Sequence, residues 1–161
     1  MKHIFSISLI SLFFLISISF QTKAQISNQP LKMPEIGYPW KKSELLEPSV
    51  LAGVMQSGKE EIAILNIGAV EDLPGALHIG AVSDERNMTK LRQLLTNLPK
   101  HKPVVIYCGC CPFTKCPNIQ PAYQELSKNG FTQIKVLDLP TNLQTNWISR
   151  GYPIAKKQTN K

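Results

Sequence analysis

Residues 104–118 read VVIYCGCCPFTKCPN, a short apolar run followed by all four cysteines of the chain. The run Val104–Tyr107 is β-branched and continuously apolar, which predicts a parallel strand covered on both faces. A helix-like stretch follows Asn118. The thiols therefore lie on a loop between a strand and a helix. Backbone N–H groups and the positive end of the helix dipole stabilise anions at such a place, and a thiolate is one.

The rest of the chain alternates strand-like and helix-like segments. Strands are predicted at 61–68, 77–79 and 133–139, and helices at 48–58, 88–98, 119–128 and 143–150. This alternation is typical of an α/β domain with a mostly parallel central sheet flanked by helices. In open sheets of this class the site lies at the carboxyl ends of the strands, where Cys108 is expected.

The amino terminus has the features of a secretory signal. Lys2 and His3 precede an uncharged apolar run, and Thr22-Lys23-Ala24 follows it. We predict a signal peptide over 1–24, cleaved after Ala24, and a periplasmic or secreted product without a stable membrane anchor. An uncleaved membrane anchor is the alternative, because the run is near the lower length limit for a spanning helix.

The chain after the signal is expected to hold a single domain. We place an extended, proline-containing arm at 25–42, the α/β domain at 43–154 and a basic tail at 155–161. The formal net charge is +7, and the basic residues are scattered rather than clustered with aromatic residues. Nucleic-acid binding needs a dense basic patch, so we predict no nucleic-acid partner.

The crowding of the cysteines argues for chemistry. An even number of cysteines in an exported protein usually indicates structural disulfides. A bridge stabilises more when it closes a longer loop, and all four thiols here lie within nine residues, Cys108 to Cys116. Reactivity or metal binding is therefore favoured over cross-linking.

Four segments together resemble the rhodanese-like domain. They are Ile64–Gly68, Leu73–Ile79, Val104–Cys108, and an ending made of Gly130-Phe131, Leu137 and Trp147–Pro153. In that family the second segment is an I-P-G-A turn and strand, the third delivers the active cysteine, and the ending follows a G-F … L … W-x-x-x-G-Y-P pattern. The resemblance implies that Cys108 forms a persulfide and passes sulfur on. It implies a small sulfur-containing donor, a thiol or cyanide-like acceptor, and no cofactor or metal.

The chain departs from the family in three places. Asn66 and Gly68 stand where the family has an Asp-x-Arg motif, and Pro140-Thr141 replaces paired glycines. The loop from Cys108 to Asn118 is longer than the family's and carries three further thiols.

Cys108 is the predicted nucleophile, because it is the first residue beyond the strand. Lys115 and Asn118 are predicted to stabilise its anion, Lys115 by its charge. Asn118 is expected above all to cap the helix that follows it.

Cys110, Cys111 and Cys116 have three open roles. One of them can resolve a persulfide or sulfenate on Cys108, with Cys116 favoured because its ring is unstrained; this is a sulfur or thiol–disulfide relay. Two or more can bind Cu(I) or Zn(II) in a non-catalytic module. A Cys110–Cys116 or Cys111–Cys116 disulfide can shape the loop.

Other site types are disfavoured. His78 and His101 are expected in structural or solvated roles, because the sequence pairs neither with a carboxylate. A cysteine phosphatase needs an arginine near the end of its loop, and none lies between Cys108 and Asn118.

Overall fold

The computed structural model describes residues 40–58 and 61–156. The predicted signal peptide, most of the predicted arm and the last residues of the basic tail lie outside this part of the chain. Within it, no helix is both long enough and apolar enough to cross a membrane.

The described residues form a five-stranded, all-parallel sheet flanked by four helices, which confirms the predicted α/β class. The strand order is β1-β5-β4-β2-β3. The strands are β1 Leu45–Leu46, β2 Ala63–Asn66, β3 Leu77–His78, β4 Val104–Tyr107 and β5 Ile134–Leu137. The helices are α1 Pro48–Ser57, α2 Glu85–Asn97, α3 Ile119–Lys128 and α4 Leu143–Asn146, with 3-10 turns η1 Lys42–Glu44, η2 Phe113–Lys115 and η3 Ile148–Arg150.

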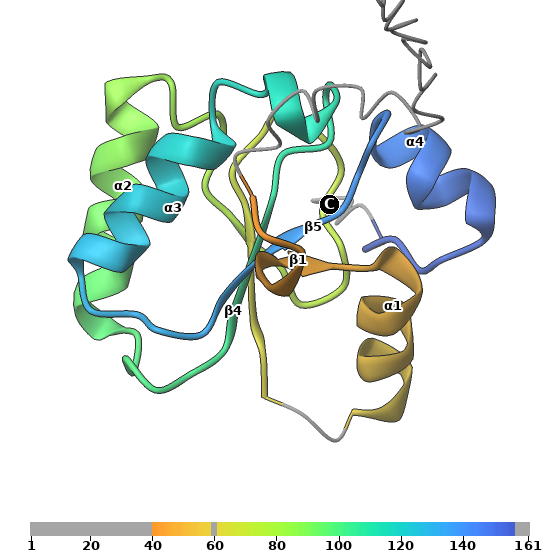
Figure 1. The fold of residues 1–161 in the computed structure, drawn as a ribbon, viewed down its shortest axis with the longest axis horizontal. Helices are drawn as coiled ribbons and strands as arrows, with labels where there is room; N and C mark the ends of the chain where they lie inside the picture. Colours follow the sequence, from red (N-terminus) through yellow and green to blue (C-terminus); the bar gives the residue numbers. More distant parts are fainter. Residues whose placement is uncertain (1–39, 59–60, 157–161) are drawn as a thin grey trace, which may run out of the picture. The chain divides into compact units, whose positions relative to one another are not determined.

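Helices α2 and α3 cover one face of the sheet, and α1 and α4 cover the other (Figure 1). Side chains of a strand alternate between the two faces. Val104, Ile106 and Cys108 accordingly pack in the core beneath α2 and α3, whereas Val105 and Tyr107 pack in the core beneath α1 and α4. Two covered faces explain why this strand is continuously apolar.

Element boundaries differ from the predicted ones in several places. Helix α2 begins at Glu85 rather than 88, because the Asp84 carboxylate accepts a hydrogen bond from the Arg86 backbone N–H at 2.9 Å and caps the helix. The predicted helix over 143–150 is divided into α4 and η3. Strand β1 was not predicted.

Trp40, near the end of the predicted arm, packs on the domain. Its ring meets that of Tyr123 on α3 edge to face, with 4.9 Å between centroids. The Tyr123 hydroxyl in turn donates to the Glu44 carboxylate at 3.1 Å. Trp40 is thus part of the core beneath α2 and α3, and Leu45 packs against that core.

Candidate functional site

Cys108 is the first residue after β4, the central strand of the sheet. Its side chain points to the face covered by α2 and α3, and the residue is only 1% exposed. The chain then runs through η2 and reaches α3 at Ile119, the predicted helix start. The thiol loop, residues 108–118, therefore has the predicted position at the carboxyl end of a parallel strand.

Two backbone hydrogen bonds join the thiol loop to the segment that follows β5. The Gly109 carbonyl accepts a hydrogen bond from the backbone N–H of Leu143 at 2.8 Å. Gly109 has a φ of +77°, and a Cβ there would lie 2.7 Å from the Leu143 Cβ, so the position requires glycine. Farther along, the buried Phe113 donates its backbone N–H to the Leu139 carbonyl at 3.4 Å. The turn at Gly109 is what allows Cys110 to lie against Cys108.

Three of the four sulfurs form a cluster. The Sγ atoms of Cys108 and Cys110 are 3.2 Å apart, and those of Cys108, Cys110 and Cys116 all lie within 4.8 Å of one another. Cys111 lies outside this trithiol cluster, with its Sγ 3.6 Å from that of Cys110. Cys108 and Cys116 are buried, Cys110 is exposed, and all four cysteines are free thiols. Both Cys110 and Cys116 are thus close to Cys108, whereas the sequence favoured Cys116 alone.

Four N–H donors point at two of these sulfurs. The Asn118 side-chain amide donates to Cys108 Sγ at 3.3 Å, and the backbone N–H of Cys110 donates to the same sulfur. The backbone N–H groups of Asn118 and Ile119, at the start of α3, donate to the sulfur of Cys116. The helix amides therefore serve Cys116, and Cys108 is served by the Asn118 side chain.

These contacts concentrate negative charge on Cys108. Hydrogen bonding from the Cys116 thiol, and then from Asn118 and Cys110, lowers the pKa of Cys108 to about 5 against the opposing effect of burial. The pKa of Cys116 is raised, first because its proton is held on Cys108 and then by burial. Burial, followed by the contact with Cys108, raises the pKa of Cys110 to about 12. These contacts therefore favour the thiolate on Cys108 over a thiolate on Cys110 or Cys116.

Gly68 packs directly against Cys108. A Cβ at this position would lie 2.4 Å from the Cys108 carbonyl oxygen and 2.8 Å from its Sγ, distances that no side chain could occupy. The absence of a side chain at Gly68 therefore allows the segment after β2 to approach the thiol. Sequence reasoning missed this role, although a glycine at a strand end is a known indicator of close backbone approach.

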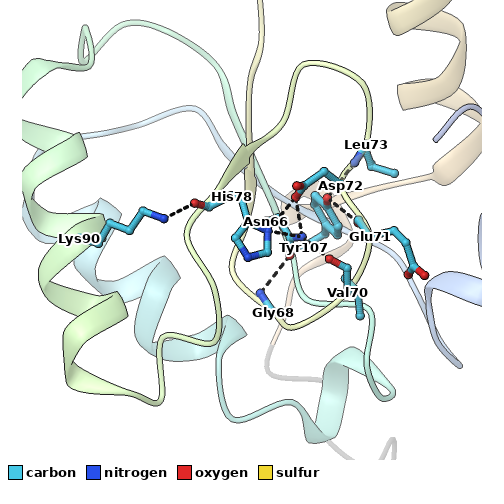
Figure 2. A network of polar contacts seen from close by, with 9 residues as sticks. All are labelled: Asn66, Gly68, Val70, Glu71, Asp72, Leu73, His78, Lys90 and Tyr107. Atoms are coloured by element: carbon cyan, nitrogen blue, oxygen red, sulfur yellow. Dashed lines mark hydrogen bonds and ion pairs between the residues drawn. The ribbon is translucent and has the colours of Figure 1, made fainter. Parts of the chain in front are cut away.

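Asn66, at the end of β2, is the centre of a second polar cluster (Figure 2). Its side chain is fully buried, and its Nδ2 donates to the Val70 carbonyl and to Asp72 Oδ1, both at 2.8 Å. Its Oδ1 accepts the backbone N–H of Gly68 at 3.1 Å. Asn66 thus fixes the loop that follows β2.

Tyr107 closes the same loop from β4 (Figure 2). Its hydroxyl accepts the Leu73 backbone N–H at 3.0 Å and donates to the Glu71 carbonyl at 3.1 Å. Burial raises the pKa of Tyr107, so the phenol stays neutral and keeps the proton that it donates. A cluster of polar side chains, which we call the amide cluster, therefore holds residues 67–76 in place. It consists of Asn66, Asp72, His78 and Tyr107.

His78 contradicts the expectation that no carboxylate pairs with it. Its Nδ1 lies 2.9 Å from Asp72 Oδ1, and its side chain is 49% exposed. The two residues are six apart in sequence and meet only because the loop turns back. No hydrogen bond joins His78 to any cysteine among the described residues, so it belongs to the amide cluster. His101 lies exposed in the linker before β4.

The two residues predicted to stabilise the anion behave differently. Asn118 does contact Cys108, but the expectation that it caps α3 is wrong, because its side chain makes no capping bond. Its Oδ1 instead accepts the Ser83 backbone N–H at 2.8 Å. Lys115 is exposed at the end of η2 and is not among the groups that lower the pKa of Cys108.

Comparison with known proteins adds no family. No protein-family model matches the chain, and no curated protein matches it.

Proposed function

We propose that the chain is an exported, rhodanese-like sulfurtransferase that carries sulfane sulfur as a persulfide on Cys108. One observation carries the proposal. Cys108 lies at the carboxyl end of the central strand, and the Asn118 amide and the Cys110 backbone N–H both donate to its sulfur. These donors stabilise the thiolate, which is the nucleophilic form of cysteine.

The transfer has two balanced steps. The Cys108 thiolate attacks the outer sulfur of a donor such as thiosulfate, an S–S bond forms, and sulfite leaves with the electron pair of the broken bond. A nucleophilic acceptor, cyanide or a thiolate, then attacks the outer sulfur of the persulfide. The S–S bond breaks, and Cys108 regains its thiolate. The N–H groups that stabilise the thiolate also stabilise the persulfide anion, since both anions place negative charge next to the same donors.

Burial defines how the donor reaches Cys108. The residue is 1% exposed, and its exposed neighbour Cys110 lies across it with the sulfurs 3.2 Å apart. Sulfur transfer therefore requires the donor to approach from the exposed side, next to Cys110. Replacing Cys110 by serine is expected to leave the first step measurable.

The test is a thiosulfate:cyanide assay with product thiocyanate as the readout. Cys108→Ser is expected to abolish turnover, and Cys111→Ser, outside the trithiol cluster, is the matched control that retains it. Circular dichroism verifies that both variants fold. A fully active Cys108→Ser protein would refute the proposal.

The 3.2 Å separation of the Cys108 and Cys110 sulfurs favours a second candidate, a thiol–disulfide relay. In this reaction the Cys108 thiolate attacks a partner's disulfide and forms a mixed disulfide. Deprotonated Cys110 then attacks Cys108, which releases the reduced partner and leaves a Cys108–Cys110 bridge. Cys110→Ser distinguishes the two reactions, because the relay requires Cys110 to form the Cys108–Cys110 bridge seen by peptide mapping, whereas sulfur transfer to cyanide should continue without it.

A further inference from the structure

The trithiol cluster has the spacing of a metal site. Sulfurs that share one metal ion at a bond length of about 2.3 Å lie about 4 Å from one another. The Sγ atoms of Cys108, Cys110 and Cys116 are all within 4.8 Å of one another, and those of Cys108 and Cys110 are 3.2 Å apart. Small changes in side-chain torsion would therefore place all three around a common centre.

Two of the three clustered sulfurs belong to buried residues, Cys108 and Cys116, which are 1% and 8% exposed. A cation bound between two neighbouring thiolates removes their mutual repulsion, and burial strengthens that attraction because little water screens it.

The ligand set selects the class of metal. It contains only thiols, and it is the one group of three or more potential ligands of this kind within the described residues. Thiolates favour soft ions such as Cu(I) and zinc. Structural zinc usually takes four protein ligands. Cys111 is outside the cluster, so three sulfurs are available, a number that satisfies Cu(I), a d10 ion stable in trigonal coordination.

We propose that Cys108, Cys110 and Cys116 bind one Cu(I) ion in a three-coordinate thiolate site. Cys110, the exposed member, is where the ion enters, and Cys108 and Cys116 hold it in the buried part of the loop. The site does not require sulfur transfer. Because it uses Cys108, bound Cu(I) and sulfane sulfur exclude each other.

The experiment is an anaerobic titration of the reduced chain with Cu(I), competed by bicinchoninate, with no sulfur donor present. We expect one Cu(I) per chain retained against the chelator, and a copper K-edge absorption spectrum that fits three sulfur ligands. Retention of no copper, or a fit with four sulfurs, would overturn the proposal.

Variants assign the ligands. Cys110→Ser is the first choice, because the residue is exposed and its replacement leaves the core intact; Cys116→Ser tests the buried ligand, with circular dichroism to verify folding. Each is expected to weaken Cu(I) binding by more than the roughly 10- to 100-fold cost of losing an outer-sphere partner. Cys111→Ser is the matched control and is expected to bind as the unaltered chain does. Equal losses in Cys111→Ser and Cys110→Ser would contradict the three-sulfur assignment.

The two proposals fail separately. A chain that binds Cu(I) through these sulfurs but forms no thiocyanate upholds the copper site and refutes sulfur transfer. A chain that turns over thiosulfate but loses all copper to the chelator upholds sulfur transfer and refutes the copper site.

Discussion

The trithiol cluster and the amide cluster occupy the carboxyl ends of the neighbouring strands β4 and β2, yet they are built on opposite principles. In the amide cluster, unlike groups meet: an amide donates to a carbonyl and a carboxylate, and a phenol bridges an N–H and a carbonyl. In the trithiol cluster, like atoms meet, and N–H donors converge on them.

The difference separates structure from chemistry. Buried polar groups that are fully partnered hold a loop in place and are stable as they stand. Sulfurs crowded together with several donors gain most when one of them is ionised or a cation joins them. Tyr107 and Cys108 illustrate this contrast, because they are adjacent in sequence and point to opposite faces of the sheet.

Gly68→Ala should have the largest effect, and it should act on the trithiol cluster rather than on the amide cluster. The added Cβ would lie 2.4 Å from the Cys108 carbonyl oxygen and 2.8 Å from its Sγ, so Cys108 must move. Displacement of a reacting group by about 1 Å costs about 100-fold in rate, which is the loss expected in kcat/KM for thiosulfate. Overpacking should also lower the free energy of unfolding by about 1–3 kcal/mol.

Gly53→Ala is the control for that change. Gly53 lies within α1, and a Cβ there meets nothing within 4 Å. It should leave turnover unchanged. Equal activity in the two alanine variants would mean that the contact of Gly68 with Cys108 has no part in catalysis.

The pH dependence of the thiolate is the second prediction. Because the pKa of Cys108 is lowered to about 5, thiolate absorbance near 240 nm should rise as the pH increases through 5 and then stay level through neutrality. Asn118→Asp retains an oxygen for the Ser83 N–H, removes the donor to Cys108 and adds a like charge. Asn118→Asp should therefore raise the pH at the midpoint of the absorbance change. A midpoint near the ordinary value of 9 in the unaltered chain would contradict the proposed stabilisation of the Cys108 thiolate.

Tyr107→Phe should affect the amide side alone. The change leaves the Leu73 N–H without its buried acceptor, at a cost of about 1–3 kcal/mol in the free energy of unfolding. Urea denaturation measures the loss. The thiolate midpoint and the turnover should stay as they are, and a shift in either would show that the two clusters are coupled through β4.

His78→Gln should have the smallest effect. The pair with Asp72 is half exposed, and exposed ion pairs contribute about 1 kcal/mol or less. Thermal unfolding should change little, and sulfur transfer should not change. A large loss of sulfur transfer would mean that His78 takes part in the reaction rather than only in holding residues 67–76 in place.

The sequence predicted the elements whose signals are local. Val104–Tyr107 and Ile119–Lys128 have their predicted bounds, because an apolar β-branched run and an amphipathic stretch ended by Asn129-Gly130 are each sufficient on their own. Strand β1 has only two residues, and its pairing with β5 is a tertiary contact that leaves no pattern in the sequence.

The missed features of the site are also contacts between distant segments. Asn118 has the residue type of a helix cap, but its side chain donates to Cys108 and accepts from Ser83 instead of capping α3. The pairing of His78 with Asp72 depends on a turning loop, and the approach of Gly68 to Cys108 depends on the register of β2 with β4. The place of the thiols and the contact of Asn118 with Cys108 could be predicted from the sequence, whereas the bond of Asn118 to Ser83 and the approach of Gly68 could not.

The most direct test of the account is to locate the transferred sulfur. The reduced, full-length chain is treated with thiosulfate, its intact mass is measured, and peptides are mapped after alkylation. We expect a gain of about 32 Da, carried as a persulfide on Cys108 and absent from Cys108→Ser. An added sulfur on another cysteine while Cys108 remains a free thiol, or no added sulfur at all, would contradict the account.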